Sequence, residues 1–242
     1  MKIFDEDFDH LPFPGRWLGG ISLVLAPILL LAGEVLKFRF DFFFPAQLRA
    51  YQDHPMLIFT AYSLFLAGNI LLWPAIITLA NLIGRTKPVW AVWGGSLVLF
   101  GLFARTFHSG INHLAFQLVS ILSLPKATEA VAQSYGAFHI VSILSGAILF
   151  GWAVLAVGAW LSGTLRPVGV VALAMMSALM IGVLKGGTVM SVIATTCLCI
   201  ALLPLGVRVL AHGSMPPARL FWGWLIFSSA VIGLFFFLGQ AG

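Results

Sequence analysis

The chain has 242 residues, of which 60% are hydrophobic and only 9% are charged, and its formal net charge is +5. A soluble domain carries roughly 25% charged residues, so this composition excludes a water-soluble globular protein. The basic residues stand singly along the chain and form no patch, so nothing indicates nucleic-acid binding. We therefore predict a single integral membrane domain over residues 1–242, with membrane lipid as a partner.

Hydrophobic segments long enough to cross a membrane, about 20 residues each, recur along the whole chain. Short polar or proline-containing stretches, such as residues 85–88 and 212–217, separate them. The pattern predicts an all-α fold, a polytopic transmembrane helix bundle of about seven spans. The predicted spans are residues 17–37, 55–83, 89–124, 129–162, 167–184, 188–210 and 218–240.

The basic residues are distributed slightly unevenly between the two sides of this predicted bundle. Because cytoplasmic loops carry an excess of Lys and Arg, the distribution favours a cytoplasmic N-terminus in a cytoplasmic (inner) membrane. Seven basic residues lie on the N-terminal side: Lys2, Arg16, Arg85, Lys87, Arg166, Arg208 and Arg219. Five lie on the opposite side: Lys37, Arg39, Arg49, Lys126 and Lys185.

Residues 38–54 connect the first two predicted spans and are predicted to lie at the membrane interface. The stretch 37–45 places five phenylalanines between charged residues, and aromatic side chains among Lys and Arg suit the headgroup boundary. These residues could pack on the bundle as an interfacial segment. They could also form a lid over a substrate site, and the sequence does not separate these two interpretations.

Glu34 is the only acidic residue well inside a predicted span, close to the end of the first. Lys37 follows three residues later, which places the two side chains on the same face of a helix. We therefore predict a structural ion pair. A role for Glu34 as a proton acceptor or as the counter-ion of Arg105 is the alternative.

The third predicted span carries a dense set of polar side chains near its centre, in residues 104–117 (ARTFHSGINHLAFQ). An arginine at the bilayer midplane costs at least about 2.5 kcal/mol, so Arg105 should face the bundle interior or a wet cavity. At about 100° per residue, the strongly polar residues fall on one half of the helix. Because guanidinium groups favour carboxylate or phosphate, we predict a pocket for an anionic ligand. Its predicted ligand-binding residues in this span are Arg105, His108, Asn112, His113 and Gln117.

The neighbouring spans contribute further polar residues to this predicted pocket. Tyr135 and His139 share one face of the fourth span, and Asn69 lies in the middle of the second. His113 and His139 are each about ten residues, or roughly 15 Å, from their shared loop, which predicts a similar depth. This histidine pair could carry protons or bind a metal ion. The sequence leaves a haem or another cofactor open.

Two functions from different classes fit these features. In the first, a pocket bounded by spans two to four binds a small anionic ligand, lipid or cofactor, for transport or membrane-embedded catalysis. In the second, the protein is a non-catalytic accessory or assembly subunit of a larger membrane protein complex. Short loops and eight tryptophans suit contacts with other membrane protein subunits. We rank the first ahead, because the polar face is denser than interhelical hydrogen bonding alone requires.

Overall fold

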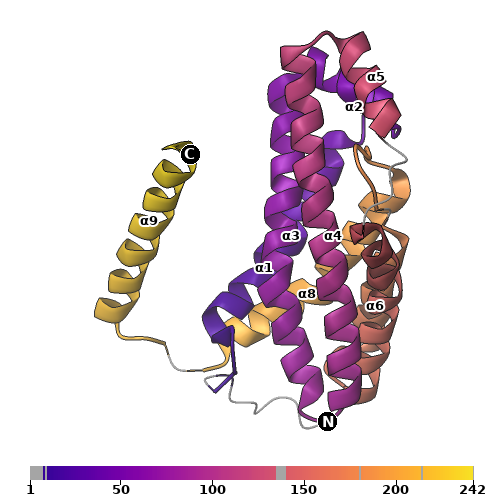
Figure 1. Ribbon diagram of the computed structural model, residues 1–242. Coiled ribbons are helices and arrows are strands. Elements are labelled where there is room, and N and C mark those ends of the chain that lie inside the picture. The colour runs from indigo at the N-terminus through magenta and orange to yellow at the C-terminus, as the bar shows by residue number, and fades with distance from the viewer. Residues whose placement is uncertain (1–7, 9, 135–139, 180, 214, 242) are drawn as a thin grey trace.

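The computed structural model describes residues 8, 10–134, 140–179, 181–213 and 215–241. These residues form the predicted all-helical bundle, and no strand occurs among them (Figure 1). The helices are α1 (Gly15–Lys37), α2 (Phe44–Asp53), α3 (Pro55–Gly84), α4 (Pro88–Ile121), α5 (Leu124–Ser134), α6 (Val141–Ser162), α7 (Pro167–Ala174), the 3₁₀ turn η1 (Met175–Ala178), α8 (Val189–Ala211) and α9 (Ala218–Ala241).

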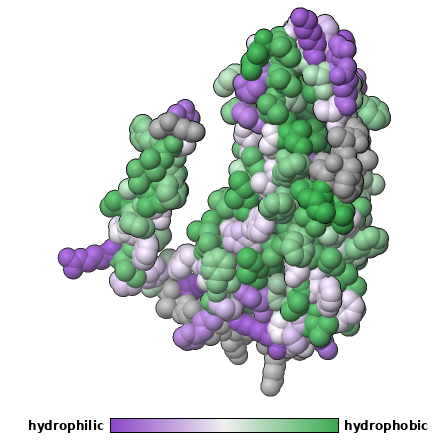
Figure 2. All heavy atoms as spheres, in the orientation of Figure 1, coloured by the Kyte–Doolittle hydropathy of each residue, from purple (hydrophilic) through white to green (hydrophobic). Residues whose placement is uncertain are grey.

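Among the described helices, six are long and apolar enough to cross a membrane: α1, α3, α4, α6, α8 and α9. Hydrophilic residues gather mainly at the two ends of the bundle, and apolar residues cover the belt between them (Figure 2). Large hydrophobic side chains such as Val92, Phe100 and Leu114 are exposed along α4. Such a surface requires lipid as its solvent. The chain is an integral membrane protein.

The bundle is built from helices in close contact along their lengths. α1 packs on α3 and α8, and α4 packs on α3 and α6. Glycine makes the closest of these contacts possible, because small residues let transmembrane helix backbones approach one another. A Cβ atom on Gly33 of α1, for example, would lie 2.7 Å from the carbonyl oxygen of Ala61 in α3. The packed helices give the polar residues inside them fixed positions.

The fifth predicted span, residues 167–184, is discontinuous, and its prediction as one continuous helix was wrong. α7 and η1 together rise about 20 Å, and the chain then continues without helical structure until α8 begins. It still climbs along α4, since Leu179 contacts Arg105 and Leu184 contacts Asn112. Gly182, which has a φ of 149°, lies within this non-helical part. The bundle therefore has about seven crossings, of which the fifth is half helix and half irregular chain.

The fourth predicted span, residues 129–162, is shorter in the structure than predicted. Residues 129–134 belong to α5, which lies with α2 at one end of the bundle (top of Figure 1). α6 begins only at Val141, and residues 135–139 lie outside the described part of the chain. The third span ends three residues earlier than predicted, at Ile121. The physical reason is that α5 is amphipathic: Ala127 and Val131 are buried on one face and its other residues are exposed or half-buried.

The connection between the first two spans contains α2, which packs against α3, α4 and α5. Its Leu48 is fully buried in a small hydrophobic cluster with Ile58 and Phe116. This cluster is separate from the main core of the bundle. α2 and α5 therefore form a cap on one end of the bundle.

α9 stands apart from the other helices (Figure 1). None of its described side chains is buried, and it makes no contact with another described helix. It exposes large apolar residues all round, including Trp224, Phe227 and Ile232. In a membrane this surface contacts lipid or another protein.

Candidate functional site

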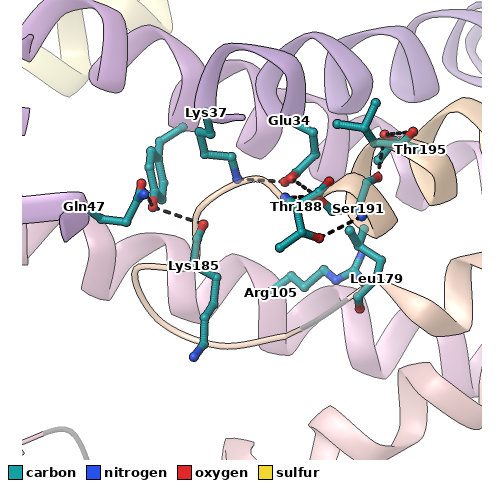
Figure 3. A network of polar contacts seen from close by, with 11 residues as sticks. Glu34, Lys37, Gln47, Arg105, Leu179, Lys185, Thr188, Ser191 and Thr195 are labelled. Carbon is teal, nitrogen blue, oxygen red and sulfur yellow. Dashed lines mark hydrogen bonds and ion pairs between the residues drawn. The ribbon is translucent and has the colours of Figure 1, made fainter. Parts of the chain in front are cut away.

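Polar side chains from several elements meet around one cavity next to the break in the fifth crossing (Figure 3). The cavity has a volume of about 40 Å³, which is room for roughly three water molecules. Its polar lining comes from α1, α3, α4, the non-helical residues 179–188 and the first turn of α8. These polar residues are Glu34, Lys37, Tyr62, Arg105, His108, Ser109, Asn112, Lys185 and Ser191.

The cavity lies inside the bundle, level with the end of α1 and the middle of α4. Arg105 is 17 residues from Pro88 and 16 residues from Ile121, the two ends of α4, or about 25 Å from each at 1.5 Å per residue. The apolar stretch of α1 ends at Lys37, at the same cavity. The cavity is therefore enclosed by the helices of the bundle near the end of α1, next to the cap formed by α2 and α5.

Arg105 is buried, with 4% of its surface exposed. Its Nη2 donates a hydrogen bond to the carbonyl oxygen of Leu179, at 3.2 Å. Its Nε and Nη1 have no acceptor among the described residues, although every N–H of a guanidinium is a donor. The Glu34 carboxylate attracts this guanidinium electrostatically, but buried N–H donors without acceptors are costly. The arrangement thus leaves a positive charge and unused donors facing the cavity.

Glu34 and Lys37 form the predicted ion pair. Lys37 Nζ donates to Glu34 Oε1 at 2.7 Å, and both side chains are buried. The Lys37 ammonium also lies 4.9 Å and 4.5 Å from the ring centres of Tyr62 and Phe65, which adds two cation–π contacts. The charge of Lys37 is therefore compensated within the protein.

Glu34 also reaches the start of α8. Its Oε2 accepts a hydrogen bond from Ser191 Oγ at 2.6 Å. Thr188 and Ser191 form a capping box, in which the Thr188 hydroxyl accepts from the Ser191 N–H and Ser191 Oγ accepts from the Thr188 N–H. A carboxylate is favourable at a helix N-terminus because of the helix dipole. Glu34 therefore faces the amide end of α8.

Arg105 lies on the other side of the break, at the carbonyl end of η1. Leu179 directly follows the last residue of η1, and its carbonyl group is the acceptor of the Arg105 hydrogen bond. Cations are favourable at the carbonyl end of a helix. A cation from α4 and a carboxylate from α1 thus face the two helix ends that the interruption creates.

Side chains from other helices hold the irregular segment in place. Asn112 Oδ1 accepts from the Leu184 N–H at 2.6 Å. Tyr62 Oη lies 3.2 Å from the Lys185 carbonyl oxygen and 3.0 Å from Gln47 Oε1, and its one proton serves both acceptors. Leu184 has a φ of 51°, which is uncommon for a residue with a side chain. Non-helical backbone at membrane depth is tolerated only where it is buried in protein or lines a cavity. Here it does both.

The structure brings three of the predicted ligand-binding residues, Arg105, His108 and Asn112, to the cavity wall. Asn69 is buried nearby, but its amide donates to the Leu102 carbonyl and the Thr106 hydroxyl and so links α3 to α4.

Gln117 is half-buried outside the cavity, and His113 is exposed on the outer surface of α4. The structure does not bring either of them to the pocket, because the face of α4 that contacts the irregular segment is narrower than half of the helix.

Tyr135 and His139 lie outside the described residues. The predicted pairing of His113 with His139, and a metal site built on it, therefore stay predictions. Within the described part of the chain, no group of three or more His, Cys, Asp or Glu side chains is placed to hold a metal ion.

The sequence reasoning missed several residues of the site, including Lys185, Ser191 and Tyr62. One signal for them was present: Lys185 precedes two glycines, and a glycine-interrupted hydrophobic segment is a pointer to a binding site in membrane proteins. Ser191, three residues after Thr188, could also have been read as part of a helix cap. Nothing in the sequence indicated that Glu34 contacts Ser191.

Comparison with known proteins adds no functional information. No family model matches the chain, and no curated protein or solved structure is significantly similar to it. The function must therefore be argued from the cavity itself. Its chemistry is that of a buried guanidinium with unused donors, which suits the oxygens of a carboxylate or phosphate.

Proposed function

We propose that the protein is a membrane transporter that binds a small anion, with a carboxylate or phosphate group, against Arg105. The observation that carries this proposal is that this guanidinium is 4% exposed and that two of its nitrogens have no acceptor among the described residues. Lys37 is neutralised by Glu34, so Arg105 gives the cavity a net positive charge. An anionic ligand would supply the missing partner.

The size and lining of the cavity support a small charged group as the occupant. A volume of about 40 Å³ suits the anionic end of a ligand. Phe42, Phe65 and Ile181 also line the cavity and offer apolar surface to a hydrocarbon part. Asn112 and Ser109 are polar neighbours that could set its orientation.

The interrupted fifth crossing favours transport over a purely structural role. Discontinuous helices near the middle of the membrane are a recurrent way in which transporters bind substrate. In this protein the interruption lies directly at the cavity, between η1 and α8. Residues 181–188 form no helix, so they could change conformation at a lower cost than an intact helix.

Thermal unfolding in mild detergent tests the anion site. A ligand that binds only the folded protein raises its melting temperature, because it stabilises the folded state by RT ln(1 + c/Kd), where c is the free ligand concentration. We expect sodium phosphate or sodium acetate, at constant ionic strength, to raise the Tm of the wild type. Arg105→Gln should lose this response, whereas Arg219→Gln, at an exposed position on α9, should keep it. An equal response of all three proteins would contradict the proposal.

A second candidate function rests on α9. A helix that is apolar all round and makes no contact with the described remainder of the bundle suits the accessory-subunit hypothesis, in which it packs against another membrane protein. A photo-crosslinking residue in place of Phe227 tests this in native membranes. A single discrete adduct would support an accessory role, and adducts with lipid alone would contradict it.

A further inference from the structure

A second and larger groove lies on the surface of the bundle, between α2 and the chain that connects it to α1. Its volume is about 450 Å³, within the usual range for ligand sites of roughly 300–1,000 Å³. It shares no lining residue with the Arg105 cavity. The residues that give it its chemistry are Arg39, Phe40, Asp41, Arg49, Asp53 and His54.

The groove contains two arginines and two aspartates that form no ion pair with one another. None of these four side chains forms an ion pair or a side-chain hydrogen bond with any residue in the described ranges. On one wall the Arg39 guanidinium lies 4.9 Å from the Phe40 ring centre, and the Phe40 ring lies 5.7 Å from the His54 ring, tilted at 46° to it. The groove therefore offers separate positive and negative groups to one ligand.

The position of the groove is that of lipid headgroups. The apolar helix α1 ends at Lys37, and Arg39 follows two residues later. Phe38 and Phe43 in the same connection are 49% and 70% exposed, and aromatic side chains are enriched at the membrane boundary. Hydrophilic residues gather at this end of the bundle (Figure 2).

The orientation of α2 is fixed by its opposite face. Gln47 and Leu48 are fully buried, and the Tyr51 ring stacks on Phe116 with centres 4.8 Å apart. Arg49 and Asp53, four residues apart, consequently lie together on the groove side of the helix. The charged side of the groove is thus held in place by the core of the cap.

We infer that this groove binds the headgroup of a zwitterionic phospholipid. The lipid phosphate contacts Arg39 and Arg49, the ammonium group contacts Asp41 and Asp53, and the acyl chains lie beside Phe38 and Phe43. A patch of basic residues alone would select anionic lipids. Here the two carboxylates repel a headgroup with net negative charge and attract an ammonium group, so the groove selects a neutral headgroup with both charges.

Native mass spectrometry of the full chain tests this inference. The protein is released from nanodiscs that contain equal amounts of phosphatidylethanolamine and phosphatidylglycerol with identical acyl chains. We expect the wild type to retain the ethanolamine lipid preferentially. The double variant Arg39→Gln/Arg49→Gln should retain about tenfold less of it, because charge-assisted hydrogen bonds to the phosphate are lost.

Substitution of Asp41 and Asp53 tests most specifically how the groove selects its headgroup. Asp41→Asn/Asp53→Asn should reverse the preference toward phosphatidylglycerol, because the repulsion of anionic headgroups is removed while both arginines remain. Arg105→Gln and Arg219→Gln should retain lipid as the wild type does. The inference is overturned if the wild type retains both lipids equally or prefers phosphatidylglycerol, or if the arginine double variant retains lipid unchanged. Should that double variant not fold, Arg49→Gln and Arg49→Lys are compared, and only the glutamine variant should lose lipid.

Discussion

Lys37 and Arg105 are both buried cations on the wall of one cavity, but their surroundings differ. Lys37 has a carboxylate oxygen at 2.7 Å and two aromatic rings within 4.9 Å. Arg105 has one carbonyl oxygen at 3.2 Å and two nitrogens without an acceptor in the described structure. Burial of a charge is therefore a poor indicator of a binding site by itself. The more informative observation is a buried charge that the protein leaves uncompensated.

The largest effect should come from breaking the compensated pair. Glu34→Leu leaves the Lys37 ammonium buried without its carboxylate, which costs about 3–5 kcal/mol of the free energy of unfolding. Denaturant unfolding in mixed micelles measures this change. The double variant Glu34→Leu/Lys37→Met should recover most of the loss, since it removes both charges. Equal stability of Glu34→Leu and the wild type would show that the pair is solvated rather than buried.

A smaller loss should follow from releasing the irregular segment. Asn112→Leu removes the acceptor of the Leu184 N–H and leaves that buried donor unpaired, at a cost of about 1–3 kcal/mol. Because the segment lies against Arg105, the rise in Tm on adding phosphate or acetate should also shrink. Hydrogen exchange at residues 181–188 reports the loosening directly. Unchanged exchange there would contradict the role given to Asn112.

Gly187 tests how closely the segment is packed against α1. A Cβ atom there would lie 2.7 Å from the Glu34 carbonyl oxygen and 2.9 Å from the Phe38 nitrogen, so Gly187→Ala should cost about 1–3 kcal/mol. Gly110→Ala in α4 is the matched control, because nothing lies within 4 Å of its Cβ position. If both alanine variants unfold at the same temperature, the close approach of the segment to α1 is refuted.

The smallest effect is expected at Asn69, which is buried next to the site but links two helices. Asn69→Leu removes hydrogen bonds to Leu102 and Thr106, and interhelical polar contacts in membranes contribute about 0.6 kcal/mol on average. The response of the Tm to added phosphate should stay as in the wild type. A lost response would make Asn69 part of the binding site.

The membrane-spanning helices could be predicted from the sequence because apolar segments of the right length alternate with proline and glycine breaks. The central position of Arg105 could be predicted as well, since the high cost of placing arginine in lipid forces it into the bundle. The break in the fifth crossing could not be predicted. Glycine is common in transmembrane helices, so Gly182 did not distinguish an interruption from a helix, and the Gly186–Gly187 pair indicated only a turn between two spans.

The composition of the site depends on contacts between distant parts of the chain. Glu34 and Ser191 are separated by 157 positions, and no local pattern joins them. Helical periodicity gives the angle between two side chains of one helix but not the direction that the bundle faces. Asn112 reaches the cavity while His113, the next residue, is exposed on the outer surface. Helical periodicity alone could not distinguish these two positions.

The central claim is that Arg105 is uncompensated until an anion binds. The most direct test measures the free energy of unfolding of the wild type and of Arg105→Gln as a function of phosphate concentration at constant ionic strength. The variant keeps a polar side chain of similar width but removes the charge. We predict that the two curves cross: the variant is at least as stable without phosphate, and the wild type is more stable at high phosphate. A variant that is less stable by the same amount at every concentration would show instead that Arg105 is a structural residue.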